Sequence, residues 1–377
     1  LGIKILKKGD KWFVFGNGTN GFMQPKKILN AQNSGTSART LIGAVSSNPI
    51  SCTFTGDKSL NKRSMSRVTI YLEKLGAKIK LTNKDFLPLV IDGNQHLIPQ
   101  KIVIEKPSAQ IKTSLIFAGL NMKGKLTIIE KVKTRDHTEK LLTYLNIKHK
   151  KRIYKNGSHS IELNGPYEIT SKNIQVAGDP SSAAFFVVGA LITPNSNIVL
   201  ENVLLNPTRI AYIKVLKKMG GNIKIKKTKK ISGEDCGSIH VKYSKLRGIK
   251  IKKSLSPLLI DEYPILSIAA CFAKGNTVME GLDELRHKES DRIKSIVYNL
   301  TKLGIEVKNF GEDIYIRGVE KFTKKICKIK SFDDHRIACS FMILKILNDK
   351  IKIDNEKCVS ISYPNFKKDL KKIITIY

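Results

Sequence analysis

The sequence predicts an α/β (α+β) protein of two domains in which one helix–turn–strand unit is repeated. The chain has 377 residues, enough for two or three domains with sizeable cores. Its 41% hydrophobic and 26% charged residues are ordinary for a globular protein. Helix-like stretches that end in glycine and continue into an alternating strand recur along the chain, and a new helix begins near residue 177. A duplicated unit in two domains accounts for these observations.

The repeat is clearest where a helix ends. The opening LGIKILKKGDKWFVFG (1–16) has the pattern of the second half of a unit, so we expect the first half to precede Leu1. Three later stretches join apolar residues at helical spacing to an alternating strand through Gly76, Gly220 and Gly304. Asn146 takes the glycine's place in a weaker copy, since asparagine also tolerates the left-handed conformation. These turns recur about every 70 to 80 residues, which favours a repeat over chance similarity.

A second domain is expected to begin after QVAGDP. In QVAGDPSSAAFFVVGALI (175–192), Asp179 or Ser181 is suited to cap a helix of small, closely packing residues. We therefore expect a first domain at 1–177 and a second domain at 178–377.

The formal net charge of +35 has two explanations. A nucleic-acid partner requires basic residues gathered in one stripe, with aromatic residues interleaved in an RNA-binding sheet. Stretches such as IKIKKTKK (223–230) are instead dispersed and alternate with isoleucine. This pattern favours a general lysine bias with an attraction for small anions.

The six cysteines show neither a CxxC pair nor zinc-like spacing, so we expect buried thiols and a reducing, cytoplasmic location. No apolar run reaches transmembrane length and no signal peptide is visible. We therefore expect no membrane partner.

The stretch ELRHKESDRI (284–293) contains an unusual set of charges. On a helix, Lys288 and Arg292 would lie four residues apart on one face, where like charges repel. A solvated helix face is one explanation, and an anion bound between the two cations, with Glu289 beside them, is the other.

Other stretches place polar residues at expected helix starts, where unpaired N–H groups favour anions. Asp261 and Glu262 precede an apolar helix, and Asp334, His335 and Arg336 lead into another. N-capping, a satisfied histidine or a surface arginine explains each one singly. Together they suit a substrate with several negative charges and a reaction that needs an acid and a base. The stretches are NSGTSAR (33–39), GDKSLNKRSM (56–65), SAQIKTSLIFAGL (108–120), TRDHTEKLL (134–142), LIDEYPILSIAACFA (259–273) and SFDDHRIACSFMIL (331–344).

In this order, the stretches resemble the blocks of the 5-enolpyruvylshikimate-3-phosphate (EPSP) synthase family from about Gly2 to Phe366. The resemblance implies the enolpyruvyl transferase fold, with two domains of repeated βαβαββ units that close on substrate. It also implies transfer of the enolpyruvyl group of phosphoenolpyruvate to the 5-hydroxyl of shikimate 3-phosphate, with release of phosphate. It implies no metal or organic cofactor and no nucleic acid, and we expect a monomer.

The resemblance also implies the site residues. In the family's addition–elimination route, Glu289 matches the proton donor and Asp261 the acceptor, and Lys288 joins them as a catalytic group. The residues implied for shikimate 3-phosphate are Ser108, Ala109, Gln110, Arg135, Asp261 and Lys288. Those implied for phosphoenolpyruvate are Gly35, Arg63, Gln110, Arg292 and Arg336.

The chain departs from the family pattern at several points. The family's N-terminal Lys-Ser-x-x-x-Arg stretch is expected to be absent from the chain, because GDKSLNKR (56–63) matches the later Arg63 loop. Ser64 replaces a usual proline, Ile361 a lysine found in some members, and His287 a small apolar residue. An inactive or truncated paralogue, an RNA-processing protein of related fold and the sister transferase that acts on a UDP-sugar are the alternatives. The last of these typically carries a cysteine in the loop matching residues 56–65, which holds none here.

Overall fold

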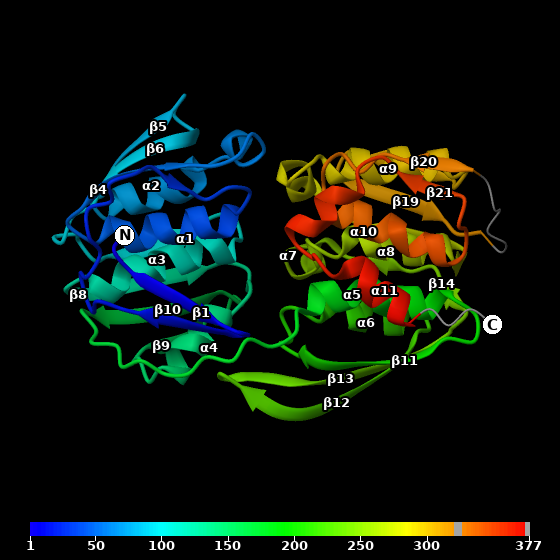
Figure 1. Cartoon of the computed structure of the whole chain (residues 1–377), viewed down its shortest axis with the longest axis horizontal. Helices are drawn as coiled ribbons and strands as arrows, with labels where there is room; N and C mark the ends of the chain where they lie inside the picture. The colour runs from blue at the N-terminus through cyan, green and yellow to red at the C-terminus, as the bar shows by residue number, and fades with distance from the viewer. Residues whose placement is uncertain (320–325, 374–377) are drawn as a thin grey trace. The chain divides into compact units, whose positions relative to one another are not determined.

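The computed structural model describes residues 1–319 and 326–373, and the chain divides into two compact units, Leu1–Asn173 and Ile174–Tyr377 (Figure 1). Each unit has its own hydrophobic core. As predicted, the fold is α/β, with small mixed sheets covered by helices.

Four copies of one βαβαββ arrangement make up most of the chain. In each copy, the first and second strands are parallel neighbours. The fourth strand lies between the second and the third and is antiparallel to both, so the order across the sheet is first, second, fourth, third. In copy 3 the first strand is reduced to a single parallel bridge between Gly178 and Val203. Parallel strands need a crossover connection, and a helix supplies it in every copy.

The elements of unit 1 fall into copies 1 and 2. Copy 1 contains β3 (Leu29–Asn30), α1 (Gly35–Ser46), β4 (Ser51–Thr55), the 3-10 helix η1 (Leu60–Lys62), α2 (Ser66–Lys74), β5 (Lys78–Thr82) and β6 (Phe86–Asp92). Copy 2 contains β7 (Lys101–Ile104), α3 (Ala109–Asn121), β8 (Gly124–Glu130), α4 (His137–Tyr144), β9 (Lys150–Ile153) and β10 (His159–Gly165).

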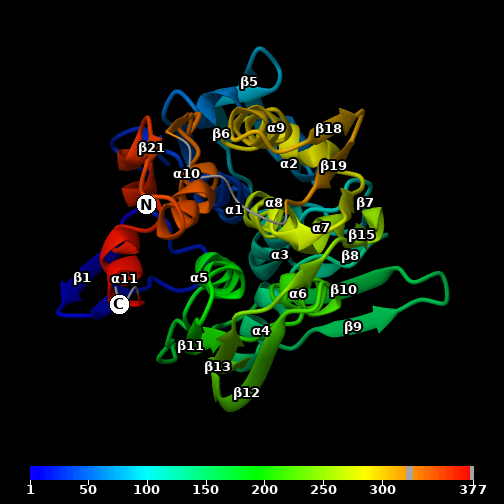
Figure 2. The same ribbon diagram turned by 90° about the vertical axis from the view of Figure 1, so that its right-hand side faces the viewer.

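The elements of unit 2 fall into copies 3 and 4. Copy 3 contains α5 (Pro180–Ile192), β11 (Asn197–Leu204), α6 (Ala211–Lys218), β12 (Asn222–Ile231) and β13 (Glu234–Lys242), the last two forming the long ribbon visible in Figure 2. Copy 4 contains β15 (Lys250–Ile251), α7 (Ser256–Leu259), α8 (Tyr263–Cys271), β17 (Asn276–Met279), η3 (Asp283–His287), α9 (Arg292–Lys302), β18 (Val307–Phe310) and β19 (Asp313–Arg317). β14 (Leu246–Arg247), which precedes copy 4 in the chain, pairs in parallel with β16 (Ala273–Lys274), which lies between α8 and β17.

Two partial units complete the structure. β1 (Lys4–Lys8) and β2 (Lys11–Phe15) form an antiparallel hairpin whose residues are all exposed, consistent with the predicted second half of a unit. In unit 2, β20 (Cys327–Ile329) and β21 (Ile351–Ile353) pair in parallel across α10 (His335–Ile343), and α11 (Phe366–Ile373) follows.

The second helix of every copy ends in the same way. The residues predicted to stop these helices have positive φ angles of 95° at Gly76, 62° at Asn146, 98° at Gly220 and 77° at Gly304. In each case the amide of the next residue donates to the carbonyl five residues earlier, as Ala77 does to Leu72 at 3.1 Å. This is the Schellman arrangement, so the sequence prediction is confirmed at all four turns.

Helix packing sets the position of the functional segments in unit 1. α1 and α3 run side by side in the middle of the unit (Figure 1), and a Cβ added at Gly43 of α1 would lie 2.1 Å from the carbonyl oxygen of Ser114 in α3. Only glycine allows this approach of the two backbones. The close contact fixes the N-termini of α1 and α3, which carry Gly35 and Gln110.

No single helix spans residues 284–293. The 3-10 helix η3 ends at His287, Lys288 is extended with ψ −156°, and α9 begins at Arg292 after its N-cap Asp291. Lys288 and Arg292 therefore do not share a helix face, and the predicted repulsion at helical spacing does not arise. The carboxylate of Asp291 accepts from the Lys294 amide, and this cap defines the start of α9.

The six cysteines are buried with free thiols, as expected. Within residues 1–319 and 326–373, no helix has the length and apolarity needed to cross a membrane. The same part of the chain holds no group of three or more His, Cys, Asp or Glu side chains placed to bind a metal ion.

Candidate functional site

The candidate site residues form two groups, one in each unit. The unit 1 group consists of Gly35, Arg39, Arg63, Ser108, Ala109, Gln110 and Arg135. The unit 2 group consists of Asp261, Lys288, Glu289, Arg292, Asp334 and Arg336. Arg39 and Asp334 were not among the predicted site residues.

Two guanidinium groups lie at the start of α1. Gly35 is the first residue of α1, and a Cβ added there would lie 3.0 Å from Arg39 Nη1 and 3.3 Å from Arg63 Nη1. Arg63 donates to Asn33 Oδ1 at 3.0 Å, which holds it beside the turn that enters α1. A helix N-terminus with two arginines beside it is suited to a carboxylate or phosphate.

Gln110 connects α1 to α3. Its carbonyl oxygen accepts from Arg39 Nη1 at 2.7 Å, and its amide nitrogen donates to Thr36 Oγ1 at 2.8 Å. Arg39 also donates to the carbonyl oxygen of Ser64 at 2.9 Å, so one buried arginine joins three segments. One feature of the sequence could have indicated Arg39: it lies one helical turn after Gly35, on the same side of the expected helix.

The other unit 1 residues lie at the starts of α3 and α4. Ser108 is the N-cap of α3 and accepts from the Ile111 amide at 3.4 Å, and such a cap contributes about 1 kcal/mol. Ala109 and Gln110 follow in the first turn, half-buried. Arg135 lies in the loop between β8 and α4 and is also half-buried.

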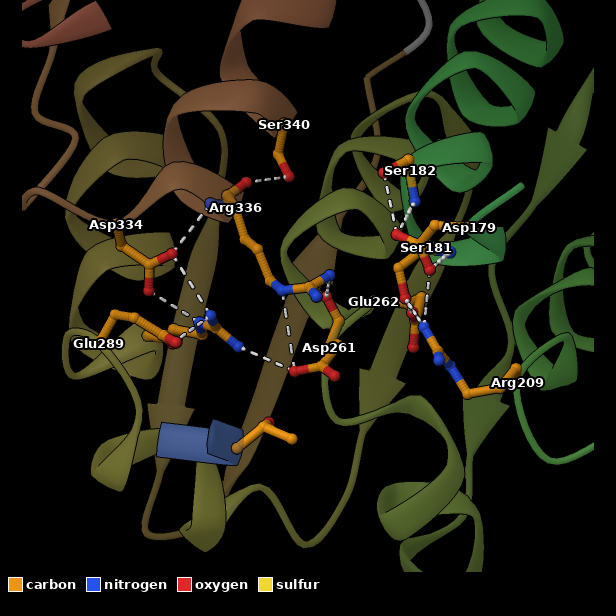
Figure 3. Close-up of polar contacts among 12 residues, drawn as sticks. Asp179, Ser181, Ser182, Arg209, Asp261, Glu262, Glu289, Asp334, Arg336 and Ser340 are labelled. Atoms are coloured by element: carbon orange, nitrogen blue, oxygen red, sulfur yellow. Dashed lines mark hydrogen bonds and ion pairs between the residues drawn. The ribbon is translucent and has the colours of Figure 1, made fainter. Parts of the chain in front are cut away.

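Arg292 is the centre of the unit 2 group. Its side chain is 1% exposed and contacts three carboxylates, which Figure 3 labels. The distances are 2.8 Å from Nε to Asp334 Oδ2, 2.6 Å from Nη2 to Glu289 Oε2 and 3.4 Å from Nη1 to Asp261 Oδ1. The two acids predicted to transfer protons are therefore joined through one guanidinium group.

Arg336 approaches the same group from α10. Its Nη1 donates to the carbonyl oxygen of Asp261 at 3.2 Å, and its Nε lies 3.8 Å from Asp261 Oδ1. Asp334 caps α10 by accepting from the Arg336 amide at 2.9 Å. One carboxylate thus places both arginines, and the capping function expected of the DDHR stretch is confirmed.

Burial and neighbouring charges alter the acidity of this group. Burial opposes the charged form of Arg292, but Asp334 and the other carboxylates raise its pKa above the usual value. Burial also opposes ionisation of Asp334, and Arg292 outweighs it, so the pKa of Asp334 is lowered. Burial lowers the pKa of Lys288, which Asp261 opposes and Arg292 assists.

A second network anchors the chain beside Asp261. Glu262 is 1% exposed and accepts from Ser181 Oγ in α5, and Arg209 Nη2 donates to Ser181 Oγ at 2.8 Å (Figure 3). The carboxylate of Glu262 makes no capping bond to α8. Capping therefore does not account for the acids in LIDEYP, and Glu262 instead ties the Asp261 segment to the start of α5.

The comparisons with known proteins agree over nearly the whole chain. The model of the family described as EPSP synthase (3-phosphoshikimate 1-carboxyvinyltransferase) matches residues 1–370. The 3-phosphoshikimate 1-carboxyvinyltransferase of Caldicellulosiruptor bescii is 43% identical over 371 residues, which cover 97% of this chain and 84% of that protein. That of Petrotoga mobilis is 40% identical over 369 residues, with coverage of 97% and 84%.

A solved structure of EPSP synthase from Acinetobacter baumannii matches with a TM-score of 0.84 at 37% identity. The match covers 99% of this chain and 84% of that chain. The repeated helices and sheets described above therefore match a known EPSP synthase structure over nearly the whole chain. The chain belongs to the EPSP synthase family.

Proposed function

We propose that this chain transfers the enolpyruvyl group of phosphoenolpyruvate to the 5-hydroxyl of shikimate 3-phosphate and releases phosphate. Family membership over residues 1–370 supports this reaction, and neither an RNA-processing role nor transfer to a UDP-sugar is favoured by the relatives found. The observation that carries the proposal is the Arg292 group, in which both candidate proton-transfer acids contact one buried cation.

We assign shikimate 3-phosphate to hydrogen-bond donors and cations at helix starts. Ser108, Ala109 and Gln110 begin α3, and Arg135 precedes α4. From unit 2, Lys288 supplies a cation and Asp261 accepts the hydrogen bond of the 5-hydroxyl. A dianionic phosphate is favoured by these N–H groups and by the guanidinium of Arg135.

We assign phosphoenolpyruvate to the arginines. Gly35 leaves open the space beside Arg39 Nη1 and Arg63 Nη1, and Gln110 accepts a hydrogen bond from Arg39. Arg292 and Arg336 bind the anionic groups in unit 2. The carboxylate and phosphate of this substrate compete with Glu289 and Asp261 for the same guanidinium groups, so binding releases both acids for proton transfer.

The reaction then follows in two steps. The 5-hydroxyl oxygen attacks C2 of phosphoenolpyruvate, Asp261 accepts the hydroxyl proton, and Glu289 donates a proton to C3, which gives a tetrahedral intermediate. C3 next loses a proton and C2 loses phosphate, which restores the double bond. Arg292 and Arg336 stabilise the charge on the departing phosphate.

The direct test is a phosphate-release assay with both substrates, in which the enolpyruvyl product is identified by mass spectrometry. We expect release only when both substrates are present, and loss of release in Arg292→Met. Lys250→Met removes an exposed ion pair with Glu280 in the same unit and serves as the matched control. Phosphate release without shikimate 3-phosphate, or an unaffected Arg292→Met variant, would contradict the proposal.

The six free thiols suit a reducing compartment, and we propose a cytoplasmic location on that ground.

A further inference from the structure

A buried ion cluster lies beneath the segments assigned to shikimate 3-phosphate. Lys112 Nζ is 2.7 Å from Glu130 Oε2 and 2.6 Å from Glu139 Oε1. The three side chains are 2%, 6% and 8% exposed, so water screens these charges little. The Lys112 cluster, defined as Lys112, Glu130, Thr134 and Glu139, contains no residue assigned to either substrate.

The cluster joins three elements of copy 2. Lys112 belongs to α3, Glu130 is the last residue of β8, and Glu139 lies in the first turn of α4. The hydroxyl of Thr134 donates to Glu130 Oε1, which pins the loop between β8 and α4 in its middle. A direct bond between α3 and α4 supports this, because the hydroxyls of Thr113 and Thr138 are 2.6 Å apart.

Both ends of the cluster adjoin assigned ligand residues. Arg135 follows Thr134 in the chain, and Gln110 lies two residues before Lys112. A shift of the loop between β8 and α4 therefore moves Arg135 relative to the start of α3.

The charges of the cluster do not cancel. Burial opposes the charged form of Lys112, but Glu139 and Glu130 outweigh it and raise the pKa of the lysine, so the ammonium persists. Two carboxylates face this one ammonium, and Glu139 Oε2 has no hydrogen-bond partner within the described part of the chain. Burying unbalanced charge is costly compared with apolar packing of the same volume. Such a costly arrangement is better explained by the placement of a segment than by stability alone.

We propose that the Lys112 cluster is a positioning device that holds the Arg135 loop against the N-terminus of α3 and thereby sets the affinity for the phosphorylated ring substrate. The inference rests on the proposed function for the identity of that substrate. Lys112, Thr134 and Glu139 act through Arg135, whose loop they hold, and do not touch the ligand.

The test compares Lys112→Met and Thr134→Val by steady-state kinetics with each substrate varied. Misplacing a binding group by about 1 Å costs up to about 100-fold, so we expect KM for shikimate 3-phosphate to rise about tenfold or more in Lys112→Met. Thr134→Val keeps the side-chain shape and loses one hydrogen bond, so we expect a rise of about threefold with an almost unchanged melting temperature. KM for phosphoenolpyruvate, measured at saturating shikimate 3-phosphate, should stay within about twofold in both variants.

Lys125→Met is the matched control. Lys125 lies in β8, the strand that ends in Glu130, and this change removes only the surface ion pair of Lys125 with Glu162. It should leave both KM values unchanged. If Lys112→Met does not fold, Thr134→Val alone decides the matter. A Thr134→Val variant with wild-type KM for shikimate 3-phosphate would overturn the inference, as would equal changes in the two KM values.

Arg135→Ala separates this inference from the proposed function. If Arg135→Ala leaves binding of shikimate 3-phosphate intact in calorimetry, the substrate assignment fails. If Arg135→Ala weakens binding while Thr134→Val and Lys112→Met do not, the assignment stands and the positioning role of the Lys112 cluster is wrong.

Discussion

The two groups of candidate residues differ in how their cations are compensated. In the unit 1 group, Arg39 and Arg63 donate to oxygens of Gln110, Ser64, Asn33 and Ser59, and none of the seven members of the group is an acid. In the unit 2 group, three cations face three carboxylates, so the formal charges balance.

This difference suggests a division of labour. A group that contains cations and no acid of its own gains ion pairs when an anion binds. A balanced group must exchange partners when an anion binds, and the exchange releases its acids. The unit 1 group is thus suited to recognition, and the unit 2 group to proton transfer coupled to binding.

The largest expected effect comes from breaking the balance in unit 2. Arg292→Met leaves Asp334 buried without its main partner, which costs about 3–5 kcal/mol of unfolding free energy. Urea denaturation measures this loss. The double variant Arg292→Met/Asp334→Asn no longer buries an unpaired carboxylate, so it should recover much of the lost unfolding free energy but none of the activity. A stable, active Arg292→Met protein would show that the ion cluster is dispensable.

Glu289→Gln sharpens the comparison by removing only the charge of the assigned donor. General acid catalysis contributes about 10²–10⁴-fold, so we expect kcat to fall by about 100-fold or more while KM for shikimate 3-phosphate changes little. The control is Asp283→Asn, an exposed acid in η3 on the same stretch. Equal changes in kcat and KM would assign Glu289 to binding instead.

Gly35→Ala tests the unit 1 group. The added Cβ meets Arg39 and Arg63 at 3.0 and 3.3 Å, so both guanidinium groups must move. We expect KM for phosphoenolpyruvate to rise about tenfold, because displaced arginines bind the anion less well. Gly16→Ala is the control, since a Cβ there meets nothing within 4 Å. An unchanged KM for phosphoenolpyruvate would remove Gly35 and Arg63 from that site.

The smallest effect at neutral pH is expected at His335, beside the unit 2 group. Burial, assisted by Arg336, lowers its pKa from 6.5 to about 4. Between these values the unfolded chain binds a proton that the folded chain does not, so the unfolding free energy falls as pH decreases from 6.5 to about 4. His335→Asn should lose less stability across this window and match the wild type above pH 7. If the unfolding free energies of the wild type and of His335→Asn changed in parallel from pH 4 to above pH 7, the lowered pKa of His335 would be contradicted.

Local chemistry explains which features could be predicted from sequence. Gly76, Asn146, Gly220 and Gly304 mark helix ends because a left-handed residue is needed there, and this depends only on neighbouring residues. Ser108 and Asp334 were recognisable as caps for the same reason. The family resemblance supplied the reaction and most of the site residues.

Tertiary contacts explain what was missed. The pairing of Arg292 with Asp334 spans 42 residues, and no local pattern encodes it. Lys288 and Arg292 do not lie on one helix because Lys288 is extended, and Asp291 caps a helix that begins only at Arg292. Arg39 was overlooked because its contact with Gln110 depends on how α1 packs against α3.

Hydrogen exchange at C3 of phosphoenolpyruvate tests the central claim most directly. In D₂O, reversible proton addition at C3 should place deuterium in the methylene group of phosphoenolpyruvate when shikimate 3-phosphate is present, which NMR detects. The account predicts that Glu289→Gln binds shikimate 3-phosphate with wild-type affinity and incorporates deuterium at least about 100-fold more slowly. Incorporation at the wild-type rate in that variant would contradict it.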